Sequence, residues 1–199
     1  ADGEDCTLIA LKQAIGVVST KLTGMNEANP LDRFVMPDVL DACCGSRMMW
    51  FNKNDERALF IDRREGRKDM DLGTPSTKGR NPCIVSPDRI ADFRDMPFND
   101  ESFVHVVFDP PHIEKKMGTQ QTGILPFKYG VLDVSWREDL RKGFSECFRV
   151  LKPGGTLIFK WCETEIPLKD VLSLTPEKPL YGHRSGKKAN THWVAFVKA

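Results

Sequence analysis

Three short apolar runs, each closed by an aspartate, constrain the fold of this chain most strongly. They occupy residues 39–41, 59–62 and 106–109. Continuous apolar runs of this length, bounded by turn residues, are typical of strands buried on both faces of a parallel sheet. In an open α/β sheet, ligands bind outside the carboxyl ends of the strands, and the three carboxylates would lie there. The sequence therefore predicts an α/β sheet with a polar site along one edge.

Two more apolar runs and one amphipathic segment extend this pattern. Residues 83–85 and 156–161 are predicted strands. Ser135 opens the sequence Ser-Trp-Arg-Glu, which predicts a capping box in which Glu138 hydrogen-bonds back to the Ser135 amide. The helix that begins there ends before residues 153–155, and its inward-facing residues are expected to be Leu140, Phe144, Cys147 and Phe148.

The segments outside these predicted strands and this helix suggest an N-terminal extension and two long loops. Residues 7–22 place apolar side chains on one stripe and predict an amphipathic helix, so residues 1–30 are interpreted as a helical extension and residues 31–199 as one domain. The polar stretches 63–82 and 110–134 are long for loops in a compact domain. Loops of this length usually bind ligands or cover a site.

Composition excludes several classes of protein. The chain has 29 basic and 28 acidic residues among its 199, a net charge of +1, which excludes a histone-like polycation but not a local basic patch. Its six cysteines form no Cys-x-x-Cys pair, so neither a zinc site nor a disulfide framework is expected. No signal peptide and no membrane-spanning apolar run is recognised, and the expected location is cytoplasmic, without a membrane or a metal.

The spacing of two aspartates, Asp41 and Asp62, is typical of a nucleoside-binding site. Asp41 is followed by a tight turn of small residues, Ala42-Cys43-Cys44-Gly45, which would let the backbone approach a ligand closely. Asp62 follows twenty-one residues later, and an acid at about that distance holds the ribose hydroxyls in nucleoside-binding folds.

The two motifs at Asp41 and Asp62 are shared with a known family. That family also has counterparts of three further motifs in this chain: Asp92-Phe93, Asp109-Pro110-Pro111-His112 and the Leu-Lys-Pro-Gly-Gly turn at 151–155. From about residue 37 to its end, the chain resembles the class I S-adenosylmethionine-dependent methyltransferases. The resemblance implies a Rossmann-like open seven-stranded sheet, mostly parallel, with helices on both faces and an antiparallel last strand at 191–197. It also implies S-adenosyl-L-methionine as cofactor. The cofactor-binding residues it implies are Asp41, Ala42, Cys43, Gly45, Asp62, Arg63, Asp92, Phe93 and Asp109.

The Asp109-Pro110-Pro111-His112 motif resembles the Asp/Asn-Pro-Pro-aromatic motif of methyltransferases that act on planar amino or amide nitrogens. A carboxylate and a backbone carbonyl that accept the two N–H groups draw the nitrogen lone pair out of the ring plane, and two prolines hold both acceptors rigidly. The fourth residue stacks on a base that has been taken out of its helix. A histidine stands here in place of the usual aromatic residue. The resemblance assigns catalysis to Asp109, Pro110, Pro111 and His112.

The resemblance to amino-methyltransferases favours adenine N6 in DNA or RNA as the acceptor, with nucleic acid as the partner. Basic and aromatic residues in the loops and near the carboxyl terminus are the candidates for substrate contact. Two alternatives stay open: an N-methyltransferase of a protein amide or small amine, and a cofactor-binding module without catalysis. The oligomeric state is not defined by the sequence. The candidate substrate-binding residues are Lys115, Lys116, Phe127, Tyr129, His183, Arg184, Lys187 and Lys188.

Overall fold

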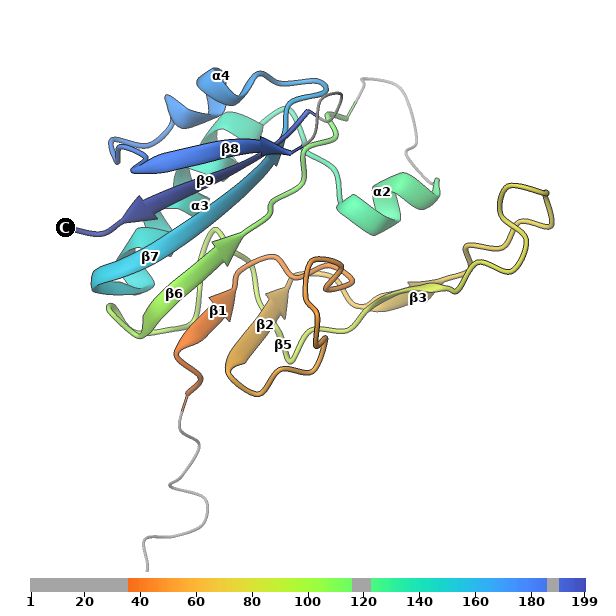
Figure 1. Cartoon of the computed structure of the whole chain (residues 1–199), viewed down its shortest axis with the longest axis horizontal. Coiled ribbons are helices and arrows are strands. Elements are labelled where there is room, and N and C mark those ends of the chain that lie inside the picture. Colours follow the sequence, from red (N-terminus) through yellow and green to blue (C-terminus); the bar gives the residue numbers. More distant parts are fainter. Residues whose placement is uncertain (1–35, 116–122, 186–189) are drawn as a thin grey trace, which may run out of the picture. The chain divides into compact units, whose positions relative to one another are not determined.

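A single mixed sheet of seven strands organises the computed structural model, which describes residues 36–115, 123–185 and 190–199 (Figure 1). The predicted helix at 7–22, the extension at 1–30, Lys116, Lys187 and Lys188 therefore lie outside the described residues. In sheet order the strands are β5 (Arg89–Ile90), β2 (Ala58–Asp62), β1 (Val39–Asp41), β6 (Phe103–Phe108), β7 (Leu151–Cys162), β9 (Thr191–Val197) and β8 (Tyr181–Ser185).

The pairing of the strands confirms the predicted Rossmann-like sheet. β1 pairs in parallel with β2 and β6, β2 pairs in parallel with β5, and β6 pairs in parallel with β7. The last strand, β9, runs antiparallel to both of its neighbours, β7 and β8. Because β1, β2, β5 and β6 point the same way, their carboxyl ends form one edge of the sheet, which we call the carboxyl edge.

The core lies between one face of the sheet and two helices, α3 (Trp136–Val150) and α4 (Leu168–Leu172). The side chains predicted to face inward from α3 are all buried. The helix begins after Ser135 as predicted, but the capping box is not formed. Glu138 pairs with Arg141 instead, and the Ser135 hydroxyl donates to Asp139 at 3.0 Å. The ion pair with an arginine one turn ahead competes successfully for the glutamate.

On the opposite face of the sheet, the loop between β1 and β2 provides the cover within the described residues. Phe60 of β2 packs there against Trp50, with ring centroids 4.8 Å apart, and the Arg47 guanidinium lies 3.9 Å from the Phe60 ring centroid. Arg47 also pairs with Asp88 and donates to two backbone carbonyls, which ties this loop to the segment that leads into β5.

The stretch predicted as a long loop at 63–82 contains one strand of a two-stranded antiparallel ribbon. β3 (Gly66–Lys68) pairs with β4 (Cys83–Val85), so the predicted strand at 83–85 belongs to this ribbon and not to the main sheet. We call residues 66–85 the arm and residues 69–82 its tip. Figure 1 shows the arm extending away from the sheet, beyond the short helix α2 (Ile124–Tyr129).

Candidate active site

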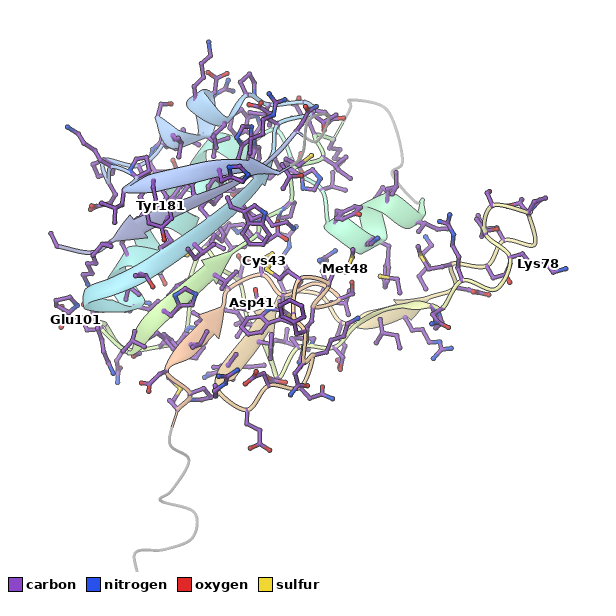
Figure 2. The ribbon with its side chains drawn as sticks, viewed as in Figure 1. Asp41, Cys43, Met48, Lys78, Glu101 and Tyr181 are labelled. Carbon is purple, nitrogen blue, oxygen red and sulfur yellow. The ribbon has the colours of Figure 1, made fainter. Side chains whose placement is uncertain are left out.

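The aspartate that ends β1 is buried beneath the turn that follows it. Asp41 accepts hydrogen bonds from the Cys43 N–H at 3.2 Å and from the Trp50 indole N–H at 2.7 Å. Figure 2 shows Asp41 and Cys43 together above β1. Burial raises the pKa of Asp41 to about 7, and the charges of Asp109 and Asp62 act in the same direction against the lowering effect of the two hydrogen bonds.

The aspartate that ends β2 reaches the same turn. Asp62 is buried and accepts the Gly45 N–H at 3.0 Å, which joins the two strand ends. Gly45 adopts a φ of 50°, a left-handed conformation that favours glycine. Ala42 is buried, and its N–H donates to Val107 of β6. The spacing between Asp41 and Asp62 thus brings both carboxylates to one turn, as predicted.

An arginine that the sequence interpretation did not select contacts Asp62. Arg64 binds both carboxylate oxygens through Nε and Nη2, each at 3.0 Å, and its Nη1 donates to the Phe127 carbonyl of α2 at 2.8 Å. Its predicted neighbour, Arg63, is exposed. The pattern Asp-x-Arg recurs at Asp92, where Arg94 makes the same two-pronged contact. The repeated Asp-x-Arg pattern is the signal in the sequence that could have identified Arg64.

The third predicted cofactor acid sits one strand further out. Asp92 follows β5 and is held by Arg94, which also pairs with Asp139 of α3. Burial would raise the pKa of Asp92, but the hydrogen bonds and charge of Arg94 keep it below its usual value. Phe93 turns into the core, with its ring centroid 5.2 Å from that of Phe108. Its side chain therefore serves the core in this structure.

The predicted catalytic aspartate pairs with a lysine on the neighbouring strand. The carboxylate of Asp109, directly after β6, lies 2.5 Å from the Lys160 ammonium of β7. Burial raises the pKa of Asp109, and the Lys160 charge opposes that rise. A lysine in the middle of an otherwise apolar strand is costly unless it is paired. That anomaly at position 160 was a signal that the sequence interpretation passed over.

The two prolines after Asp109 are buried and fix the turn. Gly130, with a φ of 73°, packs so closely on this turn that a Cβ there would lie 2.7 Å from Pro111 Cγ. His112 follows, with its ring centroid 5.4 Å from that of Tyr129 and 6.4 Å from that of Trp161. Burial lowers the pKa of His112, so the imidazole is neutral at pH 7.

Two adjoining cavities open at these residues. The smaller, about 50 Å³, is lined by Asp109, His112, Tyr129 and Lys160 together with the turn after β1. The larger, about 510 Å³, lies between that turn and the base of the arm. Residues common to both linings are Gly45, Ser46 and Lys128. The catalytic candidates therefore line a small chamber beside a much larger cavity.

The predicted substrate-binding residues divide by position. Tyr129 lines the small cavity, whereas Phe127 of the same helix packs against the base of the arm, 6.0 Å from the Lys68 ammonium. Lys115 is half-exposed and pairs with Asp133 at 3.6 Å. His183 and Arg184 lie on β8, three strands from β6, which places them about 14 Å from the Asp109 strand at roughly 4.8 Å per strand.

Within residues 36–115, 123–185 and 190–199, no three His, Cys, Asp or Glu side chains are grouped in a way that would hold a metal ion. In the same part of the chain, no helix is long and apolar enough to cross a membrane.

No protein-family model and no curated protein matches this chain. Among solved structures it is similar to the PH0226 protein from Pyrococcus horikoshii OT3, with 17% identity, 81% of each chain covered and a TM-score of 0.47. It is also similar to a SAM-dependent methyltransferase from Methanosarcina mazei, with 12% identity, 86% of this chain and 98% of the other covered, and a TM-score of 0.44. A third is 1,6-didemethyltoxoflavin-N1-methyltransferase from Burkholderia thailandensis, with 14% identity, 100% and 92% coverage, and a TM-score of 0.44. Since these identities and scores are low, the fold assignment rests on the strand order and register of the chain itself.

Proposed function

We propose that this chain is an S-adenosylmethionine-dependent methyltransferase that methylates an exocyclic amino nitrogen, adenine N6 of a nucleic acid. The observation that carries the proposal is the convergence of Asp41, Asp62 and Asp109 at adjacent strand ends, beside the rigid Pro110-Pro111 turn. Three carboxylates at such close quarters repel one another, and a cationic ligand relieves that repulsion.

The residue types at this edge fit the cofactor. The left-handed Gly45 lets the backbone approach a ligand closely, and burial, with the nearby charges of Asp109 and Asp62, keeps the pKa of Asp41 raised. Asp41 and the Cys43–Gly45 turn would hold the methionine portion, Asp62 the ribose and Asp92 the adenine. S-adenosylmethionine supplies a methyl group that is already activated on a positively charged sulfur. Arg64 now holds both Asp62 oxygens, so ribose binding at Asp62 requires this guanidinium to shift.

The acceptor would be positioned by the turn after β6. Lys160 engages Oδ2 of Asp109, which leaves Oδ1 to accept an N–H of the acceptor amine. The buried prolines keep this carboxylate and the Pro110 carbonyl at a fixed separation. The Asp109 carboxylate would accept the proton that the nitrogen releases on methylation. Neutral His112 supplies a flat surface for the base.

Labelled transfer to defined nucleic acids tests the proposal. The full chain is incubated with methyl-labelled S-adenosylmethionine and duplex DNA, single-stranded DNA or RNA, and the product is digested to nucleosides. We expect the label in N6-methyladenine and a steep loss of nucleic-acid binding as salt rises. Label found only in protein or in a small amine, with binding insensitive to salt, would contradict the proposal. A chain that binds no S-adenosylhomocysteine in calorimetry would contradict every methyltransferase reading.

A variant of the catalytic candidate sharpens this test. Asp109→Ala should abolish turnover while leaving S-adenosylhomocysteine affinity within about tenfold, or roughly 1.4 kcal/mol. Since this change leaves Lys160 without its carboxylate, the double variant Asp109→Ala/Lys160→Met serves as the matched control for folding. If affinity falls as much as turnover in both variants, Asp109 is a cofactor ligand instead of an acceptor for the amine.

A further inference from the structure

The arm replaces the packed crossover expected between two neighbouring parallel strands. β2 and β5 are adjacent and parallel, and the chain between them forms the β3–β4 ribbon and its tip. Nearly every residue of the tip is exposed or half-exposed, and none belongs to the buried core clusters. A segment of this length that buries so little adds little to the stability of the sheet, so its role is sought in what it contacts outside the chain.

The tip is built as a defined loop and not as a loose connection. The carboxylate of Asp71 accepts the N–H groups of Gly73 at 2.9 Å and Gly79 at 2.8 Å, and Thr74 and Thr77 bond to each other at 2.7 Å. These contacts tie the first half of the tip to the second. A loop held in one conformation loses little entropy when it binds.

The charges of the arm favour an anionic partner. Its basic residues outnumber its acidic residues by four to two, and the acids Asp69 and Asp71 accept backbone N–H groups within the tip. Lys78 and Arg80 are exposed, and Figure 2 shows Lys78 at the far end of the arm. Asn81 is exposed beside them, and asparagine and arginine are the side chains that pair with adenine and guanine edges.

The arm also borders the larger of the two cavities near the candidate active site. Met70 and residues 81–84 form one wall of the 510 Å³ cavity, whose other wall is the turn after β1 with Lys53 and Lys128. This cavity falls within the range of about 300–1,000 Å³ that accommodates small ligands.

We propose that the substrate is duplex DNA and that the arm enters its major groove. The inference rests on the proposed function. The major groove of B-form DNA, about 12 Å wide, admits a two-stranded β-ribbon, whose strands lie about 4.8 Å apart. The major groove of A-form RNA is too narrow and deep for side chains to read, which favours DNA over RNA.

Binding measurements on matched variants test this proposal. The arm variant Lys78→Gln/Arg80→Gln is compared with Lys142→Gln/Lys152→Gln, which removes the same charge from the exposed side of α3 and from the amino end of β7. With S-adenosylhomocysteine present, we expect the arm variant to bind duplex DNA at least tenfold more weakly, with a salt slope reduced by about 1–2. The control should stay within about twofold, and both should bind S-adenosylhomocysteine like the unchanged chain.

The variant Asn81→Ala tests the recognition of base edges separately from the electrostatic attraction to phosphate. It should broaden the set of DNA sequences that are methylated while changing the salt slope little, because the side chain carries no charge. The inference is overturned if the arm and control variants bind DNA alike, or if RNA or single strands bind as tightly as duplex DNA. In either case adenine methylation by the unchanged chain would leave the proposed function standing. Absence of any nucleic-acid methylation, with cofactor binding intact, would remove the proposed function first.

Discussion

Two connections in this molecule join neighbouring parallel strands in opposite ways. Between β6 and β7 the chain forms α3, whose buried face includes Leu140, Phe144 and Phe148. Between β2 and β5 it forms the arm, whose tip buries almost nothing. The difference teaches that one sheet can separate the part of the chain that stabilises the fold from the part that meets a partner. Substitutions should therefore affect stability on the α3 side and binding on the arm side.

The largest effect is expected at the centre of the α3 crossover. The Phe144 ring packs against Phe159 at 4.9 Å and Phe108 at 5.5 Å between centroids. Phe144→Ala should lower the free energy of unfolding by about 3–5 kcal/mol, because it leaves a cavity in a close-packed core. Urea denaturation followed by circular dichroism measures this. A loss below about 1 kcal/mol would break the comparison, since α3 would not then be the stabilising connection.

A smaller loss is expected where α3 approaches the sheet most closely. A Cβ at Gly143 would lie 2.6 Å from Phe108 Cζ and 2.7 Å from Phe93 Cδ2. Gly143→Ala should therefore cost about 1–3 kcal/mol from overpacking, offset in part by roughly 1 kcal/mol of helix propensity. Gly123→Ala is the matched control, because its new Cβ would meet only Pro126 at an ordinary 3.6 Å. Equal unfolding midpoints for the two variants would contradict the close packing described here.

At the carboxyl edge the expected effect is on binding and depends on pH. The pKa of Asp41 is raised to about 7, so its carboxyl group is protonated below that pH. The neutral carboxyl group no longer attracts a cationic ligand. S-adenosylmethionine affinity should fall by up to about tenfold per pH unit below pH 7 and level off above it. Calorimetry between pH 5.5 and 8 measures this, and Asp41→Asn should remove the dependence. An affinity that rises toward acidic pH would contradict this account of Asp41.

The same raised pKa makes Asp41 a cost to folding. Its value in the folded chain exceeds the ordinary 3.8 of a free aspartate, so the folded state holds the proton more tightly. The contribution to stability is therefore most favourable below about pH 4 and declines as pH rises toward 7.

The smallest effect is expected in the tip of the arm. Arg80 is exposed, so Arg80→Ala should change the free energy of unfolding by no more than about 0.5 kcal/mol. Urea denaturation beside Phe144→Ala places the two connections on one scale. A loss of 2 kcal/mol or more, on the order of a core truncation, would mean that the arm also stabilises the sheet.

The strands predicted from the sequence are those that carry an apolar run. The apolar runs of β1, β2, β6 and β7 reveal burial on both faces. β3 and β5 were not predicted, because Gly-Arg-Lys and Arg-Ile carry no apolar pattern and pair only through contacts made elsewhere in the chain. β4 was predicted from its apolar run, and its Cys83 and Val85 are buried, but its partner β3 has no such run, so residues 63–82 were interpreted as a loop.

For the candidate site, spacing located the acids but not their partners. Asp41, Asp62 and Asp109 follow recognisable strands, so their meeting at one edge was predictable. Arg64 and Lys160 were missed because an ion pair depends on side-chain direction and on which strands are neighbours. Lys160 meets Asp109 across the β6–β7 pair, fifty-one positions apart in the chain.

The hydrogen bond from Trp50 to Asp41 gives the chain an optical reporter of its own site. Trp136 and Trp161 are buried in the core, whereas Trp50 is half-buried and donates its indole N–H directly to the carboxylate that ends β1. Indole emission responds to charge beside the ring, so ionisation of Asp41 or arrival of a cation should shift the fluorescence of this tryptophan. Occupancy of the carboxyl edge can therefore be followed in the unlabelled protein, with Trp50→Phe identifying the source of the signal.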